Sequence, residues 1–276
     1  MKKIFYNLCG NDVFQSCVVL LKKFFHIFLD IVLPKCCCLC CCANDNGLLC
    51  DKCSQSCYQI DQKNCCKQCG YPFQTNNNDG TNFLDKNKVF CPSCKSGKRY
   101  FDIARSCYQY KAQIKKSLKN FKFYFQTDIL PLVGVSILQT YQTMFEADYI
   151  CFIPITRLKL FQKGYNHSGL ITLAFLQQLT TGKTPILLED LLVKTKISQS
   201  SKTLSQNQRW LKKYNFDINK KYQTSQWKAQ MDGKTILIID DIMTTGATLN
   251  MASYTLKKYF PNIKIECITF ARTMLY

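Results

Sequence analysis

The chain has 276 residues, of which 47% are hydrophobic and 20% are charged. This composition excludes an intrinsically disordered chain and suits one medium-sized domain with a small second one. The 37 Lys and Arg residues outnumber the 18 Asp and Glu residues, which gives a net charge of +19 and a surface that attracts phosphate, nucleic acid or acidic lipid. An AT-rich genome also enriches lysine, so the charge alone does not assign a partner.

Residues 1–33 are predicted to contain an amphipathic helix over residues 13–33. Lys22 and Lys23 interrupt its apolar run and Asp30 follows, so the segment lacks the ~20 uninterrupted apolar residues of a membrane span. The small-residue cleavage site of a secretory signal peptide is not evident either. We therefore expect a cytoplasmic protein with reduced cysteines and no transmembrane span.

Residues 34–100 are rich in cysteine and in turn-forming residues, because 14 of the 19 cysteines lie between Cys36 and Cys94. The segment contains four C-x-x-C pairs, namely Cys37/Cys40, Cys50/Cys53, Cys66/Cys69 and Cys91/Cys94. The first pair could equally be Cys38/Cys41. Two such turns complete a tetrahedral site of four cysteines, so the pairs predict two structural zinc ions. An iron–sulfur cluster is the alternative, and the spacing leaves open which pairs share an ion.

Residues 101–276 show ordinary apolar periodicity. Ile114, Leu118, Phe121 and Phe125 recur at helical spacing and predict a buried helix face. Lysines occupy the opposing face, which is either solvated or in contact with a nucleic-acid backbone; they are Lys111, Lys115, Lys119 and Lys122.

Further helices are predicted at residues 130–145, 170–179 and 249–259, and strands at residues 148–155, 235–239 and 263–270. A long polar loop is expected over residues 195–230. Alternating strands and helices predict an α/β fold with a parallel sheet.

The stretch ILIIDDIMTTGATL, residues 236–249, places two acidic residues after a buried strand. Ligands of an open parallel sheet bind beyond the carboxyl ends of its strands, where Asp240 and Asp241 would lie. The hydroxyls of Thr244, Thr245 and Thr248 and the backbone of the next helix suit a phosphate, and Gly246 permits close approach. A sugar phosphate would thus be held at both ends.

Two other interpretations explain less of this stretch. An ATPase Walker B strand would need a G-x-x-x-x-G-K-[ST] loop, but the triplets at Gly182 and Gly233 follow Gln177 and Lys228 where glycine is required. A helix cap without a ligand accounts for only one or two of the residues.

IIDDIMTTGAT resembles the phosphoribosyl-pyrophosphate signature of the type I phosphoribosyltransferases. The wider chain resembles the ComF family of competence-associated proteins, in which a double zinc ribbon precedes a phosphoribosyltransferase domain. The stretch IPITRLKLFQKGYNHS matches the family's VPl…R…RGFNQS at Pro154, Arg157, Gly164 and Asn166. Further matching positions are Pro34, Tyr110, Lys122-Phe123, Arg209, Phe216 and the C-terminal Phe270-Ala271-Arg272.

The chain departs from the family at Lys163, where the family has Arg, and at Lys212, where it has Asn. Lysine keeps the positive charge but cannot form the bidentate hydrogen bonds that a guanidinium forms with an anion.

The resemblance implies an organisation of amphipathic helix 1–33, double zinc ribbon 34–100 and phosphoribosyltransferase-like domain 101–276. It implies that Asp240 and Asp241 hold the ribose hydroxyls of phosphoribosyl pyrophosphate, with Mg²⁺ bridging ligand oxygens. The 5-phosphate would be wrapped by Met243, Thr244, Thr245, Gly246, Ala247 and Thr248. Ile155, Thr156 and Arg157 would lie near the pyrophosphate. Lys163 to His167 would form a mobile loop, with Lys163 offsetting negative charge.

Three functions remain open at this point. The first is a ComF-like role in DNA uptake during natural transformation, with single-stranded DNA and competence-machinery proteins as partners. The second is a metabolic phosphoribosyltransferase acting on a nucleobase or an amine. The third is a non-catalytic zinc-ribbon protein that binds nucleic acid.

Overall fold

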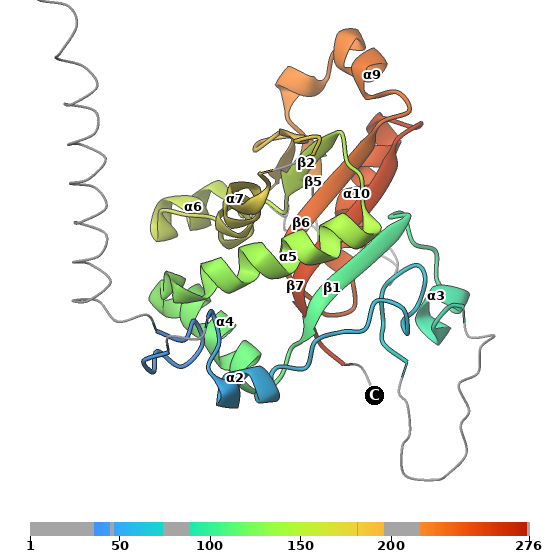
Figure 1. Cartoon of the computed structure of the whole chain (residues 1–276). Coiled ribbons are helices and arrows are strands. Elements are labelled where there is room, and N and C mark those ends of the chain that lie inside the picture. Colours follow the sequence, from blue (N-terminus) through green and yellow to red (C-terminus); the bar gives the residue numbers. More distant parts are fainter. Residues whose placement is uncertain (1–35, 45–46, 74–88, 181, 196–215, 275–276) are drawn as a thin grey trace, which may run out of the picture.

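The computed structural model describes residues 36–44, 47–73, 89–180, 182–195 and 216–274 (Figure 1). The predicted helix over residues 13–33 lies outside the described residues, as do Arg209 and Lys212. None of the helices in the described part of the chain has the length and apolarity that a membrane span requires.

A five-stranded parallel sheet forms the centre of the fold, in the order β1-β7-β6-β2-β3. Its strands are β1 (Ile103–Gln109), β2 (Tyr149–Phe152), β3 (Ile186–Leu187), β6 (Thr235–Met243) and β7 (Lys264–Arg272). The two long strands β6 and β7 lie buried on both faces along most of their length, as is usual for parallel sheets. The predicted α/β class with a parallel sheet is confirmed.

Helices cover both faces of this sheet (Figure 1). Alternate side chains of β6 enter two separate cores, with Ile238 on one face and Ile239 on the other. The Ile239 face packs against α4 (Ala112–Tyr124), α5 (Leu130–Met144) and α7 (His167–Gln178), and the Ile238 face against α10 (Ala247–Tyr259). A Cβ at Gly134 of α5 would overlap the Ala174 carbonyl oxygen, so glycine is what lets α5 approach α7.

Smaller elements complete the α10 side. Strands β4 (Leu192–Lys194) and β5 (Phe216–Ile218) pair antiparallel, and α9 (Ser225–Met231) follows a short 3-10 turn, η2 (Lys220–Tyr222). The prediction of one long loop over residues 195–230 is therefore wrong for residues 216–231. Another 3-10 turn, η1 (Thr127–Ile129), leads into α5.

The cysteine-rich segment wraps around the edge strand β1. It carries two short helices, α2 (Asp51–Ser56) and α3 (Pro92–Ser96), and the chain between them passes β1 (Figure 1). Ile60 N–H donates to the Cys107 carbonyl at 2.9 Å, and Gln109 N–H donates to the Tyr58 carbonyl at 2.8 Å. These bonds cover an edge that would otherwise offer unpaired backbone groups.

Several predicted boundaries differ from the structure, and two of these differences concern elements that form the site. The strand predicted at residues 235–239 continues to Met243, so Asp240 and Asp241 lie inside β6 rather than after it. Phe125, placed on the buried face of the helix at residues 114–125, is instead 52% exposed and has a left-handed backbone, φ 53°. Such a backbone ends α4 one residue earlier.

Candidate functional site

The two aspartates lie where β6 continues past the end of its neighbour β2. The pairing of these strands ends at Phe152 and Ile239, with a last hydrogen bond from Ile153 N–H to the Ile239 carbonyl at 3.1 Å. On the other side, Asp240 still pairs with Thr269 of β7. The predicted acidic pair is therefore anchored on one side and lies at the carboxyl edge of the sheet, where ligands of such folds bind.

Asp240 is the more buried of the two, with 8% of its surface exposed. Its Oδ1 accepts hydrogen bonds from the Ser168 hydroxyl at 2.8 Å and from the Asp241 N–H at 2.9 Å. Burial and the neighbouring charge of Asp241 raise the pKa of the Asp240 carboxyl to about 7, although these hydrogen bonds lower it. The carboxyl therefore changes charge near neutral pH, a property that is common at functional sites.

Asp241 forms an ion pair that sequence reasoning missed. Lys122, at the end of α4, lies with its Nζ 2.7 Å from Asp241 Oδ2. The helical spacing had placed Lys122 on a solvated lysine stripe. The signal that could have singled it out is its position in the Lys122-Phe123 stretch of the family resemblance.

The loop from β6 into α10 has the geometry of an anion site. Gly246 precedes the helix with φ 77°, and as the N-cap residue of α10 it has no side chain that could cap the helix. Thr244 and Thr245 are exposed, and the Thr245 hydroxyl accepts a long hydrogen bond, 3.4 Å, from Ala247 N–H. Free N–H groups and the helix dipole at such an N-terminus attract phosphate.

The segment after β2 forms a short helix, α6 (Arg157–Lys163), that was not predicted. The Thr156 hydroxyl caps it by accepting a hydrogen bond from Lys159 N–H at 3.3 Å. Ile155 and Thr156 lie between β2 and this helix, and Arg157 is exposed at its start. Lys163 ends the helix, and its Nζ lies 3.4 Å from the Lys122 carbonyl oxygen.

His167 starts α7 and also contacts the end of α4. Its Nε2 lies 3.1 Å from the Lys122 carbonyl oxygen, and burial and the charge of Lys163 lower its pKa. Asn166 donates from Nδ2 to the Ile153 carbonyl at 3.0 Å. The end of α4 is thus tied to the junction of α6 and α7, and through Lys122 to the aspartates.

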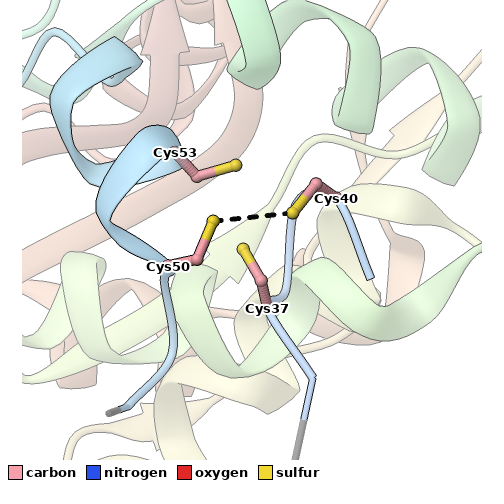
Figure 2. Close-up of side chains that lie close together, drawn as sticks. All are labelled: Cys37, Cys40, Cys50 and Cys53. Atoms are coloured by element: carbon pink, nitrogen blue, oxygen red, sulfur yellow. Dashed lines mark hydrogen bonds between the residues drawn. The ribbon is translucent and has the colours of Figure 1, made fainter. Parts of the chain in front are cut away.

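The eight predicted cysteine ligands come together in two groups of four. One holds Cys37, Cys40, Cys50 and Cys53, and the other holds Cys66, Cys69, Cys91 and Cys94, with the four Sγ atoms of each group within 4.8 Å of one another. Figure 2 shows the first group with all four thiols turned toward a common centre. Consecutive pairs therefore share a centre, and the first pair is Cys37/Cys40 rather than Cys38/Cys41.

The spacing of the thiols fits a metal ion. Cys40 Sγ lies 3.6 Å from Cys50 Sγ, and Cys69 Sγ lies 3.6 Å from Cys91 Sγ. Four sulfurs at ~2.3 Å from a tetrahedral Zn²⁺ would lie about 3.8 Å apart. Hydrogen bonds from the Cys69 and Cys94 thiols also lower the pKa of the Cys66 thiol, which favours the thiolate that a metal requires. Both groups could hold zinc.

Comparison with known proteins gives the class of this chain. Residues 184–274 match the family model described as a phosphoribosyl transferase domain, over about a third of the chain. The matched part contains β6, the Asp240–Asp241 pair and β7. The chain therefore carries a phosphoribosyltransferase domain.

Among solved structures, the chain is similar to a hypoxanthine phosphoribosyltransferase from Staphylococcus aureus. The likeness has 16% sequence identity and a TM-score of 0.29, and it covers 53% of this chain and 71% of that chain. No curated protein matches the chain.

Proposed function

We propose that the chain binds phosphoribosyl pyrophosphate with Mg²⁺ at the edge formed by the end of β6 and the start of α10. The observation that supports this best is the acidic pair at the carboxyl edge of the sheet, followed by a helix N-terminus whose N-cap residue, Gly246, has no side chain. Carboxylates can accept hydrogen bonds from the ribose hydroxyls, and the helix N-terminus can hold the 5-phosphate. Asp240 Oδ2 makes no hydrogen bond within the described residues, so it is available to a ligand.

The remaining roles follow from the same placement. Ile155, Thr156 and Arg157 follow the neighbouring strand and are assigned to the pyrophosphate. Mg²⁺ would be held through oxygen ligands, and when bound it would neutralise negative charge on the leaving group. Lys163 is assigned to the same task, and its Nζ lies 3.4 Å from the Lys122 carbonyl oxygen. Transfer would then depend on positioning and on charge neutralisation rather than on a protein nucleophile.

Calorimetry with phosphoribosyl pyrophosphate and Mg²⁺ tests this proposal. The double variant Asp240→Asn, Asp241→Asn should lose detectable binding, because both substitutions remove charge while preserving shape. Asp232→Asn is the matched control, since Asp232 is exposed and Asn262 can still hydrogen-bond to an amide oxygen at this position. Equal binding by the wild type and the double variant would refute the site.

The ComF resemblance extends the proposal to DNA uptake in natural transformation, with competence-machinery proteins as partners. Its support is the combination of two four-cysteine groups with a phosphoribosyltransferase domain. Disrupting the gene in a naturally transformable host should lower transformation frequency without creating a nucleobase requirement. A nucleobase or amine requirement with normal transformation would favour the metabolic enzyme instead.

Binding of single-stranded nucleic acid is a second candidate, favoured by one surface. The end of α4 and the helix α6 expose six large apolar side chains, namely Phe123, Tyr124, Phe125, Leu158, Leu160 and Phe161. Exposed Lys119 and Lys159 lie on the same two helices, and neither helix contains Asp or Glu. Aromatic rings that stack on bases beside lysines that contact phosphates are typical of single-strand binding.

Fluorescence anisotropy with a labelled oligonucleotide tests this second candidate. Affinity should fall steeply with salt, and Phe123→Ala with Phe161→Ala should weaken it by about 1–3 kcal/mol per stacked base. Ile186→Ala is the control, because Ile186 is also exposed but lies on the edge strand β3 rather than on α4 or α6. An oligonucleotide affinity that changes neither with salt nor with the aromatic substitutions would contradict a role of this surface in binding.

A further inference from the structure

Two arginines lie buried inside the protein, and neither forms an ion pair with an acidic residue in the described part of the chain. Arg105 on β1 is 4% exposed, and Arg272 at the end of β7 is 2% exposed. Among the described residues every ion pair is made by a lysine, and the Nε atoms of both arginines have no hydrogen-bond partner. A buried charge is strongly unfavourable unless an opposite charge compensates it, and no carboxylate among the described residues forms an ion pair with either arginine.

Both guanidinium groups reach the turn that carries Cys66 and Cys69. Arg272 Nη1 donates to the Cys69 carbonyl oxygen at 2.5 Å. Arg105 Nη1 donates to the Lys67 carbonyl oxygen at 3.1 Å and to the Ala104 carbonyl oxygen at 2.8 Å. Burial lowers the pKa of Arg105, and the charges of the nearby thiols Cys65, Cys66 and Cys69 oppose this effect only in part.

The turn is held tightly against the sheet. Ala104 N–H of β1 donates to the Gln68 carbonyl oxygen at 2.7 Å. A Cβ at Gly70 would lie 2.7 Å from the Ala104 carbonyl oxygen, so only glycine allows this contact. The second cysteine group is therefore part of the core on the α10 side, where Cys66 and Cys69 pack with Phe101 and Ala104.

A metal-bound cysteine centre would be an anion of matching charge. Four thiolates around one Zn²⁺ carry a net charge of −2, and two guanidinium groups carry +2. The first cysteine group has no such counterpart, because within the described residues no Arg or Lys side chain donates a hydrogen bond to the turns that carry Cys37, Cys40, Cys50 and Cys53. The two groups thus differ in their electrostatic surroundings.

We propose that Arg105 and Arg272 are the counter-charges of a fully deprotonated, metal-bound thiolate centre at Cys66, Cys69, Cys91 and Cys94. Their role is to stabilise this centre and to position its first turn on β1 and β7. This inference assigns a role to the arginine of the C-terminal Phe270-Ala271-Arg272 stretch. It does not depend on what the phosphoribosyltransferase domain binds.

Metal release from the zinc-loaded full chain tests the proposal. A chromogenic chelator follows the two zinc ions as they leave, and alkylation with mass spectrometry identifies which cysteines become free. In Arg272→Met, which has a similar length but no charge, the ion at Cys66, Cys69, Cys91 and Cys94 should leave about 10- to 100-fold faster. The ion at the first group should leave at the wild-type rate.

Two further variants complete the experiment. Arg272→Lys keeps the charge and should restore most of the wild-type rate, which a purely steric role would not predict. Lys220→Met removes an exposed cation that has no assigned role in ligand binding, and it should change neither rate. If Arg272→Met folds too poorly for measurement, Arg105→Met carries the same expectation. Unchanged release from the second group, or equal acceleration from both groups, would overturn the proposal.

Discussion

At the scale of single residues, Asp240 connects stability to pH. Its pKa is raised from an ordinary value of 3.8 to about 7, mainly by burial. Between these values the folded protein holds a proton that the unfolded chain has lost, so unfolding releases a proton. Stability should therefore fall as pH rises from 4 to 7, by at most about 1.4 kcal/mol per pH unit, and this contribution should be constant above pH 7.

Urea unfolding of Asp240→Asn at pH 5, 6, 7 and 8 measures this effect. The amide keeps an oxygen for Ser168 and for the Asp241 N–H but does not titrate. The stability of the variant relative to wild type should grow up to pH 7 and then stay level. Asp232→Asn, an exposed position, should run parallel to wild type; a parallel course for Asp240→Asn would mean that the carboxyl does not titrate near neutral pH.

Sequence reasoning found the aspartates but not their partners, for a physical reason. Asp240 and Asp241 stand out because charge rarely ends a run of four apolar residues. Ser168 and Lys122 stand far away in the chain and belong to ordinary helices. Only the packing of α4 and α7 on the sheet brings them to the acidic pair, and no local pattern encodes that packing.

At the scale of secondary structure, the success of prediction followed the apolar pattern. Helix α10 was expected because its apolar residues repeat at the helix period. Strands β6 and β7 were expected because each contains a short stretch rich in apolar residues. Helix α6 was missed because it buries no residue and is defined only by the Thr156 cap and by Gly164. Strand β1 was missed because Arg105 and Ser106 interrupt it with polar residues that are nevertheless buried.

The turn before α10 gives a prediction at this scale. Gly246 has φ 77°, and a Cβ there would lie 2.6 Å from the Met243 Cε atom. Gly246→Ala should cost about 1–2 kcal/mol of stability through the left-handed backbone. It should also weaken binding of phosphoribosyl pyrophosphate, because the added Cβ displaces the Met243 side chain within the proposed phosphate loop.

Gly233→Ala is the matched control for this substitution. Gly233 has a similar φ, 66°, but a Cβ there would have no atom within 4 Å. Denaturation should show a comparable loss of stability in both variants, whereas calorimetry should show weaker ligand binding in Gly246→Ala alone. Equal ligand affinity in the two variants would show that this turn does not bind the phosphate.

At the scale of the whole molecule, the cysteine segment belongs to both cores of the sheet. Cys37 and Cys53 pack with the core on the α4 and α5 side, and Cys66 and Cys91 with the core on the α10 side. The sequence suggested a separate small module, because the segment contains few Leu, Ile and Val of its own. Its side chains instead complete cores built by distant strands, which composition cannot reveal.

Removal of metal should therefore loosen the sheet and not only the cysteine segment. Without metal, the four cysteines of each centre either repel one another as thiolates or, as neutral thiols, no longer have a metal to bind. Arg105 and Arg272 would then keep a buried charge without the compensating anion. Hydrogen exchange of full-length protein treated with a zinc chelator should accelerate at the amides of β1, β6 and β7. Added Zn²⁺ should restore protection and added Mg²⁺ should not, whereas faster exchange confined to residues 36–73 and 89–96 would show that the sheet stands without its metal centres.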